Sequence, residues 1–430
     1  MPPVGGTVVS GRPVALPDAL PVQSLSPPAR NLLAAVLTVA MAASLTGVFV
    51  SLFLYVSSGR VTAMALYTLG MYVGIGLTSV WAGGLKRRVA PRALFSAGVG
   101  LTAALYALLL VLGPATAGLV LPLGLLAGVA GGVYWFSVNT LVYDLLPPRE
   151  RMLYYGTNQA LTAVGGVVLP LVAGVVIDRL PHGLGYEVVF AAAFGLYLLA
   201  FALSRRLPEG EGVGGLPVSL ALRLVRERPR YRRQWLALGL RGARDVTGGF
   251  VLVALIYLQT RSASGLAAYT AAAALAGALG ALVLRRLPPR RERPTMWLGA
   301  AACLSAAALL LAERQGLWVL VVFQLTTAFF TPLYQIPIAT HVLRAMDEDP
   351  DAPRTRASYV LSRELAVNGG RIAAIGGVLL LIARMGLGQA LVASTIAAAA
   401  IQMGAVWLSD TPPLPRTASG VAREGAAPAT

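Results

Sequence analysis

The chain has 430 residues, of which 57% are hydrophobic and only 12% are charged, and its mean hydropathy is +0.71. This balance excludes an ordinary soluble protein and predicts an integral membrane protein. The net charge of +17 could suit nucleic acid, but the sequence offers no soluble domain to present a basic surface, so we expect no nucleic-acid partner.

Apolar runs of about the length that crosses 30 Å of hydrocarbon follow one another along the chain. They are continuous rather than alternating and rich in Ala and Leu, which predicts helices rather than β-strands. Helices also leave no backbone group unpaired in lipid. The twelve runs lie near 31–56, 62–85, 93–113, 117–144, 156–177, 187–204, 235–259, 264–284, 295–312, 316–340, 357–383 and 387–408.

The segments between and outside these runs predict how the chain is organised. The first residues are rich in proline and lack a basic stretch ahead of an apolar core, so we expect a disordered tail rather than a cleaved signal peptide. The longest internal hydrophilic stretch divides the runs into two sets of six, and its alternating leucines and arginines suit either an amphipathic helix on the membrane or a solvated linker. The predicted segments are a cytoplasmic tail at 1–30, a six-helix bundle at 31–204, a cytoplasmic linker at 205–234, a second six-helix bundle at 235–409 and a cytoplasmic tail at 410–430.

The positive charge is concentrated in alternate loops. Arginine and lysine are plentiful after the second, fourth, sixth and eighth runs and before the eleventh, whereas the other loops hold few. By the positive-inside rule, the loops rich in positive charge face the cytoplasm, which predicts that both termini are cytoplasmic.

Two runs carry ionisable residues where the middle of the bilayer should be. A charge at the centre of a membrane helix costs about 2.5 to 3.5 kcal/mol on insertion scales, so such side chains must face protein, water or a ligand. They are therefore our first candidates for a functional site. The residues are Arg241, Arg244 and Asp245 in the run at 235–259, and Arg363, Glu364 and Arg371 in the run at 357–383.

Helical spacing arranges the charges of the seventh run. Arg241 and Asp245 are four residues apart and can pair on one helix face. Arg244 lies about 16 Å along the helix from the cytoplasmic edge, which is near the midplane. A buried pair of this kind either contributes to a site or only holds helices together.

In the eleventh run, Glu364, Asn368 and Arg371 fall on one stripe of the helix, which must face the interior of the bundle. Across the two runs arginine outnumbers acid, and surplus guanidinium suits an anionic group. Asp245 and Glu364 are the acids placed deep enough to carry a coupling proton.

Two loops carry recognisable patterns. The loop at 83–92 keeps basic residues at the positions of Gly-x-x-x-Asp-Arg-x-Gly-Arg-Arg, with Arg87 where the acid stands. After the fourth run, Asp144 is followed by two prolines, Arg149 and Arg151, and a related arrangement recurs at 349–356. Both patterns resemble loops of the major facilitator superfamily.

Small residues in the fifth run also carry a resemblance. Gly156, Gly165, Pro170 and Gly174 are similar to a motif of exporters in that superfamily, which implies transport out of the cell. Close packing of helices explains the same spacing equally well.

The resemblance implies an all-α integral membrane protein with twelve transmembrane helices, arranged as two six-helix bundles around a midplane site. Runs 1, 4, 7 and 10 would line a central cavity, with runs 2, 5, 8 and 11 beside it. The expected substrate-binding residues are Arg241, Arg244, Arg371, Trp135, Asn139, Asn368, Tyr334 and Gln335. The expected gating residues are Asp144, Arg149, Arg151, Lys86, Arg87, Arg88 and Arg356.

We expect a monomeric secondary transporter in a bacterial cytoplasmic membrane, surrounded by lipid. It would move a small organic solute, anionic or amphiphilic, by alternating access coupled to protons. The residues leave open an uncoupled facilitator or lipid flippase and, in another class, a non-transporting receptor or scaffold or a membrane-embedded transferase. We favour no enzyme activity. A single cysteine, Cys303, and two separated histidines, His182 and His341, predict no disulfide, metal or cofactor.

Overall fold

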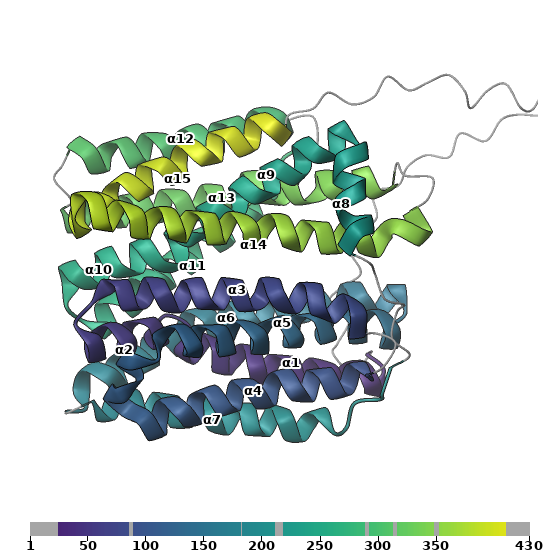
Figure 1. The fold of residues 1–430 in the computed structure, drawn as a ribbon, viewed down its shortest axis with the longest axis horizontal. Coiled ribbons are helices and arrows are strands. Elements are labelled where there is room, and N and C mark those ends of the chain that lie inside the picture. The colour runs from purple at the N-terminus through teal and green to yellow at the C-terminus, as the bar shows by residue number, and fades with distance from the viewer. Residues whose placement is uncertain are drawn as a thin grey trace, which may run out of the picture.

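A computed structural model describes residues 25–85, 89–181, 183–210, 218–288, 292–312, 316–347 and 352–409. Every secondary-structure element assigned within these ranges is helical. Figure 1 shows helices that run side by side, mostly along the long axis of the molecule.

The helices of the first part of the chain lie together in the lower half of Figure 1. They are α1 (Pro27–Thr46), α2 (Phe49–Ser58), α3 (Val61–Leu85), α4 (Pro91–Leu112), α5 (Val120–Leu145), α6 (Pro148–Arg179) and α7 (Leu184–Ser204), with a 3₁₀ turn, η2 (Gly113–Gly118), between α4 and α5.

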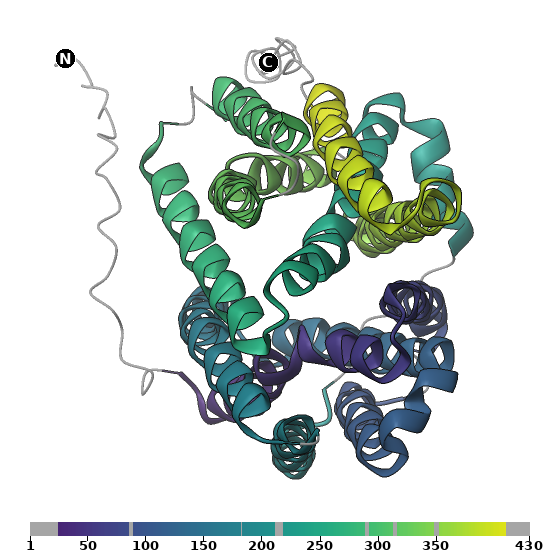
Figure 2. The same cartoon turned by 90° about the vertical axis from the view of Figure 1, so that its left-hand side faces the viewer.

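The helices of the second part fill the upper half, with α10 and α11 nearest the first group. They are α8 (Val218–Glu227), α9 (Pro229–Val246), α10 (Leu252–Thr260), α11 (Ala263–Arg286), α12 (Glu292–Ala312), α13 (Leu317–Asp347), α14 (Ala352–Met385) and α15 (Leu387–Ser409). A π-helical turn, η3 (Thr247–Val251), joins α9 to α10. Figure 2, turned by 90° from Figure 1, shows the same two groups.

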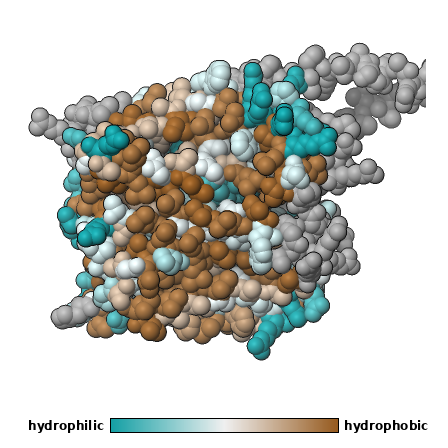
Figure 3. All heavy atoms as spheres, in the orientation of Figure 1, coloured by the Kyte–Doolittle hydropathy of each residue, from teal (hydrophilic) through white to brown (hydrophobic). Residues whose placement is uncertain are grey.

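The predicted membrane-spanning fold is confirmed. Ten segments of the described chain are helical and are long and apolar enough to cross a membrane. The other two expected passes are the charged segment α9–η3–α10 and helix α12. Figure 3 shows a face covered mainly by apolar residues, with hydrophilic ones toward the two ends of the helices, as a lipid belt requires.

Two of the passes are interrupted, which sequence periodicity did not predict. The first is divided into α1 and α2 around Gly47 and Val48. The seventh contains the π-turn η3 immediately after α9. Such turns occur frequently at functional sites, and this one begins two residues after Asp245.

Helices α9 and α14 touch backbone to backbone. A side chain on Gly242 would clash with the carbonyl oxygen of Val367, and one on Gly370 would clash with the carbonyl oxygen of Gly239. The absence of side chains at these two glycines therefore allows the close approach. It brings the end of α9 beside the middle of α14, where charged residues of both helices lie.

The two groups of helices also meet where α11 packs along α6. The carboxylate of Asp178, near the end of α6, accepts hydrogen bonds at the N-terminus of α11. One oxygen accepts from the backbone N–H of Ala263 at 2.9 Å, and the other accepts from the hydroxyl of Ser262 at 2.7 Å and from the N–H and hydroxyl of Ser264 at 2.8 and 2.6 Å. This clasp lies at the opposite end of the molecule from α8, so it joins the groups on the predicted extracellular side.

Candidate functional site

Arg371 on α14 and Asp245 on α9 form an ion pair between helices. Nη2 of Arg371 lies 2.8 Å from Oδ2 of Asp245, and the two side chains are 25% and 20% exposed. The other carboxylate oxygen of Asp245 accepts a hydrogen bond of 3.4 Å from the amide of Gln335 on α13. Asp245 is thus held by partners from two other helices.

This arrangement corrects the expected pairing of Asp245 with Arg241 on the same helix. Nε of Arg241 is buried and has no hydrogen-bond partner among the described residues. The close approach of α9 and α14 at Gly242 and Gly370 explains the difference, because it places Arg371 directly across from Asp245.

The predicted stripe of α14 is present, but its members differ in role. Arg371 donates to the side chain of Asn368 at 3.3 Å, and Asn368 donates in turn to the backbone carbonyl of Glu364 at 3.0 Å. Within the described residues, the carboxylate of Glu364 forms no hydrogen bond or ion pair.

Tyr72 on α3 completes the cluster, and sequence reasoning missed it. The guanidinium carbon of Arg371 lies 5.2 Å from the centre of the Tyr72 ring, a cation–π distance. Because α3 belongs to the first group of helices, the ion pair stands where the two groups meet. The sequence does place Tyr72 on a helix expected to lie beside the cavity. It does not show that Arg371 is the residue that Tyr72 contacts.

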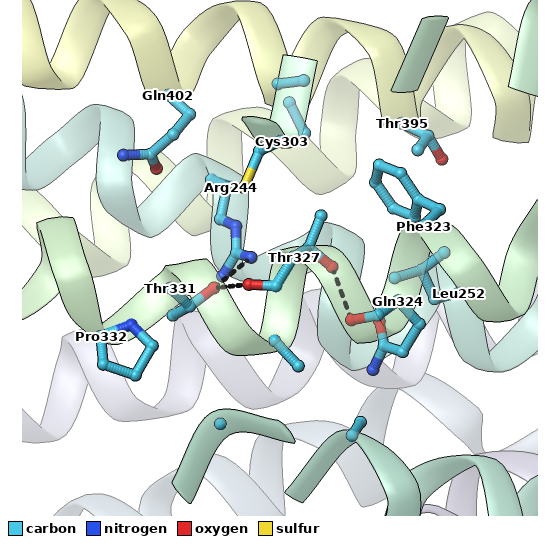
Figure 4. A pocket seen from close by; sticks show the side chains of 15 residues that line it. Arg244, Leu252, Cys303, Phe323, Gln324, Thr327, Thr331, Pro332, Thr395 and Gln402 are labelled. Carbon is cyan, nitrogen blue, oxygen red and sulfur yellow. Dashed lines mark hydrogen bonds between the residues drawn. The ribbon is translucent and has the colours of Figure 1, made fainter. Parts of the chain in front are cut away.

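Arg244 projects elsewhere. Its Nη2 donates to the hydroxyl of Thr331 at 2.7 Å, and its guanidinium carbon lies 5.8 Å from the ring centre of Tyr334, which is fully buried. Among the described residues, no carboxylate lies within ion-pairing distance of Arg244. Figure 4 shows Arg244 on the wall of a cavity.

The uncharged candidates of α5 are not part of the cluster. Trp135 is 60% exposed and contacts Tyr134 edge to face, and Asn139 is exposed on the same helix. Among the described residues, no hydrogen bond or ring contact joins either of them to Arg371 or Asp245.

In the predicted gating loop after α5, Arg151 binds the end of the preceding helix. Arg151 donates to the backbone carbonyls of Leu146 and Tyr143, each at 2.8 Å, and its guanidinium lies over the Tyr143 ring. It therefore satisfies carbonyls that the end of a helix leaves unpaired. Asp144 is among the described residues. The other gating candidates, or their side chains, lie outside the described part of the chain: Lys86, Arg87, Arg88, Arg149 and Arg356.

Comparison with known proteins identifies the family. The model of the Major Facilitator Superfamily matches residues 32–374. The uncharacterized protein YqgE of Bacillus subtilis (strain 168) is 26% identical over 340 residues, which are 79% of this chain and 79% of that protein.

Solved structures share the fold at low sequence identity. The nucleoside transporter NupG has a TM-score of 0.69 and 11% identity, covering 89% of this chain and 100% of its own. The fucose:proton symporter FucP of E. coli has a TM-score of 0.60 and 17% identity, covering 89% and 99%. The family match spans most of the sequence, and the helices agree with it, so this chain belongs to the Major Facilitator Superfamily and is a multi-pass membrane transporter, not an enzyme.

Proposed function

We propose that this protein is a proton-coupled secondary transporter of a small organic anion, in which Asp245 binds the proton and Arg371 binds the anion. The observation that carries the proposal is the ion pair between these residues, at 2.8 Å, at the meeting point of the two helix groups. An ion pair in this position can be separated when a proton binds its acid and an anion binds its arginine.

Charge balance supplies the coupling. A proton on Asp245 removes the negative charge that holds Arg371, and a carboxylate of the solute can then occupy the same guanidinium fork. The empty state and the state with both ligands are balanced, whereas a state with only one ligand leaves an uncompensated charge inside the membrane. Because such a charge raises the free energy of the protein, the state with one ligand interconverts slowly between its two conformations.

The neighbours of the pair link ligand binding to movement. Arg371 stacks on Tyr72 of the first helix group, so a shift of Arg371 toward a solute changes a contact between the groups. The π-turn that follows α9 supplies a point where the seventh pass can bend. We propose that segments 31–204 and 235–409 rock against each other as two units.

The remaining features of the proposal rest on the sequence and on the fold. The fold supports proton coupling, because a protein of similar structure is a fucose:proton symporter. The loop charges favour cytoplasmic termini in a bacterial inner membrane. Export, which the small residues of α6 favour, would carry the anion and its proton outward down the solute's own gradient. We propose a monomer, since one chain contains both helix groups.

Flux in proteoliposomes tests the proposal. Purified protein is reconstituted, a panel of radiolabelled monocarboxylates is loaded inside, and efflux is followed with and without a pH gradient. We expect efflux of one class to respond to the gradient and to carry protons, and Asp245→Asn to abolish that response while leaving exchange of the anion. If Asp245→Asn kept the native response to pH, proton coupling through Asp245 would be wrong, and an uncoupled facilitator would describe the protein better.

A further inference from the structure

A separate cavity of about 270 Å³ lies inside the second group of helices (Figure 4). All the described residues that line it come from α9 to α13 and from α15, so its wall contains no part of α1–α7. It is therefore not the space between the two groups, which the ion pair of Asp245 and Arg371 adjoins.

One polar side chain of this cavity has no hydrogen-bond partner, and a second has no counterion among the described residues. Gln402 on α15 is 1% exposed, and both its amide oxygen and its amide nitrogen are buried with no hydrogen-bond partner. Buried polar groups are rarely left unpaired, because each costs free energy in that state. Arg244, on the same wall, forms no ion pair with a carboxylate of the described residues.

The cavity is lined by both polar and apolar side chains. Figure 4 shows Gln402, Arg244 and Thr331 toward one side, and Phe323 and Leu252 toward the other, where Gln324 and Thr395 also lie. The hydroxyls of Thr331 and Thr395 already donate to backbone carbonyls of their own helices. The groups left to bind a ligand are thus the guanidinium of Arg244, the amides of Gln402 and Gln324, and the apolar surface of Phe323 and Leu252.

We propose that this cavity is a binding site for a small monocarboxylate with a compact apolar body. Its carboxylate accepts hydrogen bonds from Arg244 and from the amide nitrogen of Gln402, and its body packs against Phe323 and Leu252. One guanidinium balances one negative charge, which favours a monoanion over a phosphate dianion. A volume just below the common range of about 300 to 1,000 Å³ limits the body to one ring or a short alkyl chain.

The site is distinct from the proton-coupled site of the proposed function and does not depend on it. Arg244 and Gln402 belong to α9 and α15, so a bound carboxylate joins two helices of one group. Rocking between the groups would carry this site along unchanged.

The only cysteine of the chain provides a reporter. Cys303 lines the cavity and is 3% exposed, so its alkylation reports access to this wall. Full-length protein in detergent is treated with methyl methanethiosulfonate, and the rate is followed by intact mass. We expect benzoate to slow the reaction, and benzyl alcohol, which is similar in size but neutral, to leave it unchanged at equal concentration. The melting temperature of Arg371→Gln, which lacks the anion-binding arginine of the proposed function, gives a second readout, because benzoate should raise it.

Variants separate the proposed contacts from general effects. Arg244→Gln should weaken benzoate binding about tenfold or more, since it removes a charge-assisted hydrogen bond. Gln402→Leu, which fills the same space without polar atoms, should weaken it several-fold. Arg285→Gln removes an exposed arginine of α11 outside the cavity wall and should bind benzoate like the native protein. Asp245→Asn should lose coupled flux but keep benzoate binding, which distinguishes the two sites.

The proposal is overturned if benzoate changes neither readout, or if benzyl alcohol protects Cys303 as well as benzoate does. It is also overturned if Arg244→Gln and Gln402→Leu both bind benzoate with native affinity. Coupled flux that persists despite any of these results would leave the proposed function intact.

Discussion

Asp245 forms its ion pair with Arg371, which lies 126 residues further along the chain, although Arg241 stands one helical turn before it on the same helix. The choice of partner ties α9 to α14 and, through the ring of Tyr72, to the first group of helices. A pair within α9 alone would have no such connection. The position of the partner is therefore what makes this ion pair a candidate for coupling rather than only a support for one helix.

Removing either Arg371 or Asp245 alone should lower the stability of the protein more than removing both. Arg371→Gln leaves Asp245 with only Gln335, and we expect a loss of stability of about 2 kcal/mol, because a partly buried charge loses its counterion. Arg371→Gln combined with Asp245→Asn should recover most of that loss. The apparent melting temperature of the purified variants measures both effects. A double variant less stable than Arg371→Gln would show that the two charges do not stabilise the protein mainly by compensating each other.

Glu364 should affect the rate of transport rather than its coupling. The sequence named both Glu364 and Asp245 as proton carriers, but only Asp245 is paired with the arginine of the proposed anion site. We expect Glu364→Gln to lower flux several-fold and to keep one proton moving with each anion. The ratio of proton flux to anion flux in proteoliposomes checks this. Anion flux without proton flux in Glu364→Gln would show that the proton site is Glu364 on α14 instead of Asp245.

The clasp of Asp178 on α11 should hold the predicted extracellular side closed. Its carboxylate accepts four hydrogen bonds, and an acid at a helix N-terminus is also favoured by the helix dipole. Asp178→Ala should raise the population open at that end by about tenfold, equivalent to the loss of one or two net hydrogen bonds.

Spin labels on a Cys303→Ser background can report this opening. Leu184 at the start of α7 and Met385 at the end of α14 are exposed and lie on that side. We expect the distance distribution between labels at these positions to gain a longer component in Asp178→Ala. Asp178→Glu, which keeps the carboxylate, should show less of it. Identical distributions in all three proteins would remove the clasp from the mechanism.

The membrane-spanning helices could be predicted from sequence because long apolar runs have few alternatives in lipid. The charged stripe of α14 followed from helical spacing alone. The partner of Asp245 could not be predicted, since it depends on the contact of Gly242 and Gly370 between two distant helices. Gln402 was visible as a lone amide in an apolar run, but only the packing shows that its amide atoms have no partner.

The number of protons taken up when an anion binds is the measurement that tests the coupling most directly. Purified protein in weak buffer is titrated with the transported carboxylate at constant pH, and proton uptake is read from a pH indicator, with Asp245→Asn beside it. At a pH where Asp245 is ionised, we expect about one proton per bound anion in the native protein and none in Asp245→Asn. Anion binding without proton uptake in the native protein would contradict exchange of the Asp245 and Arg371 pair for a proton and an anion.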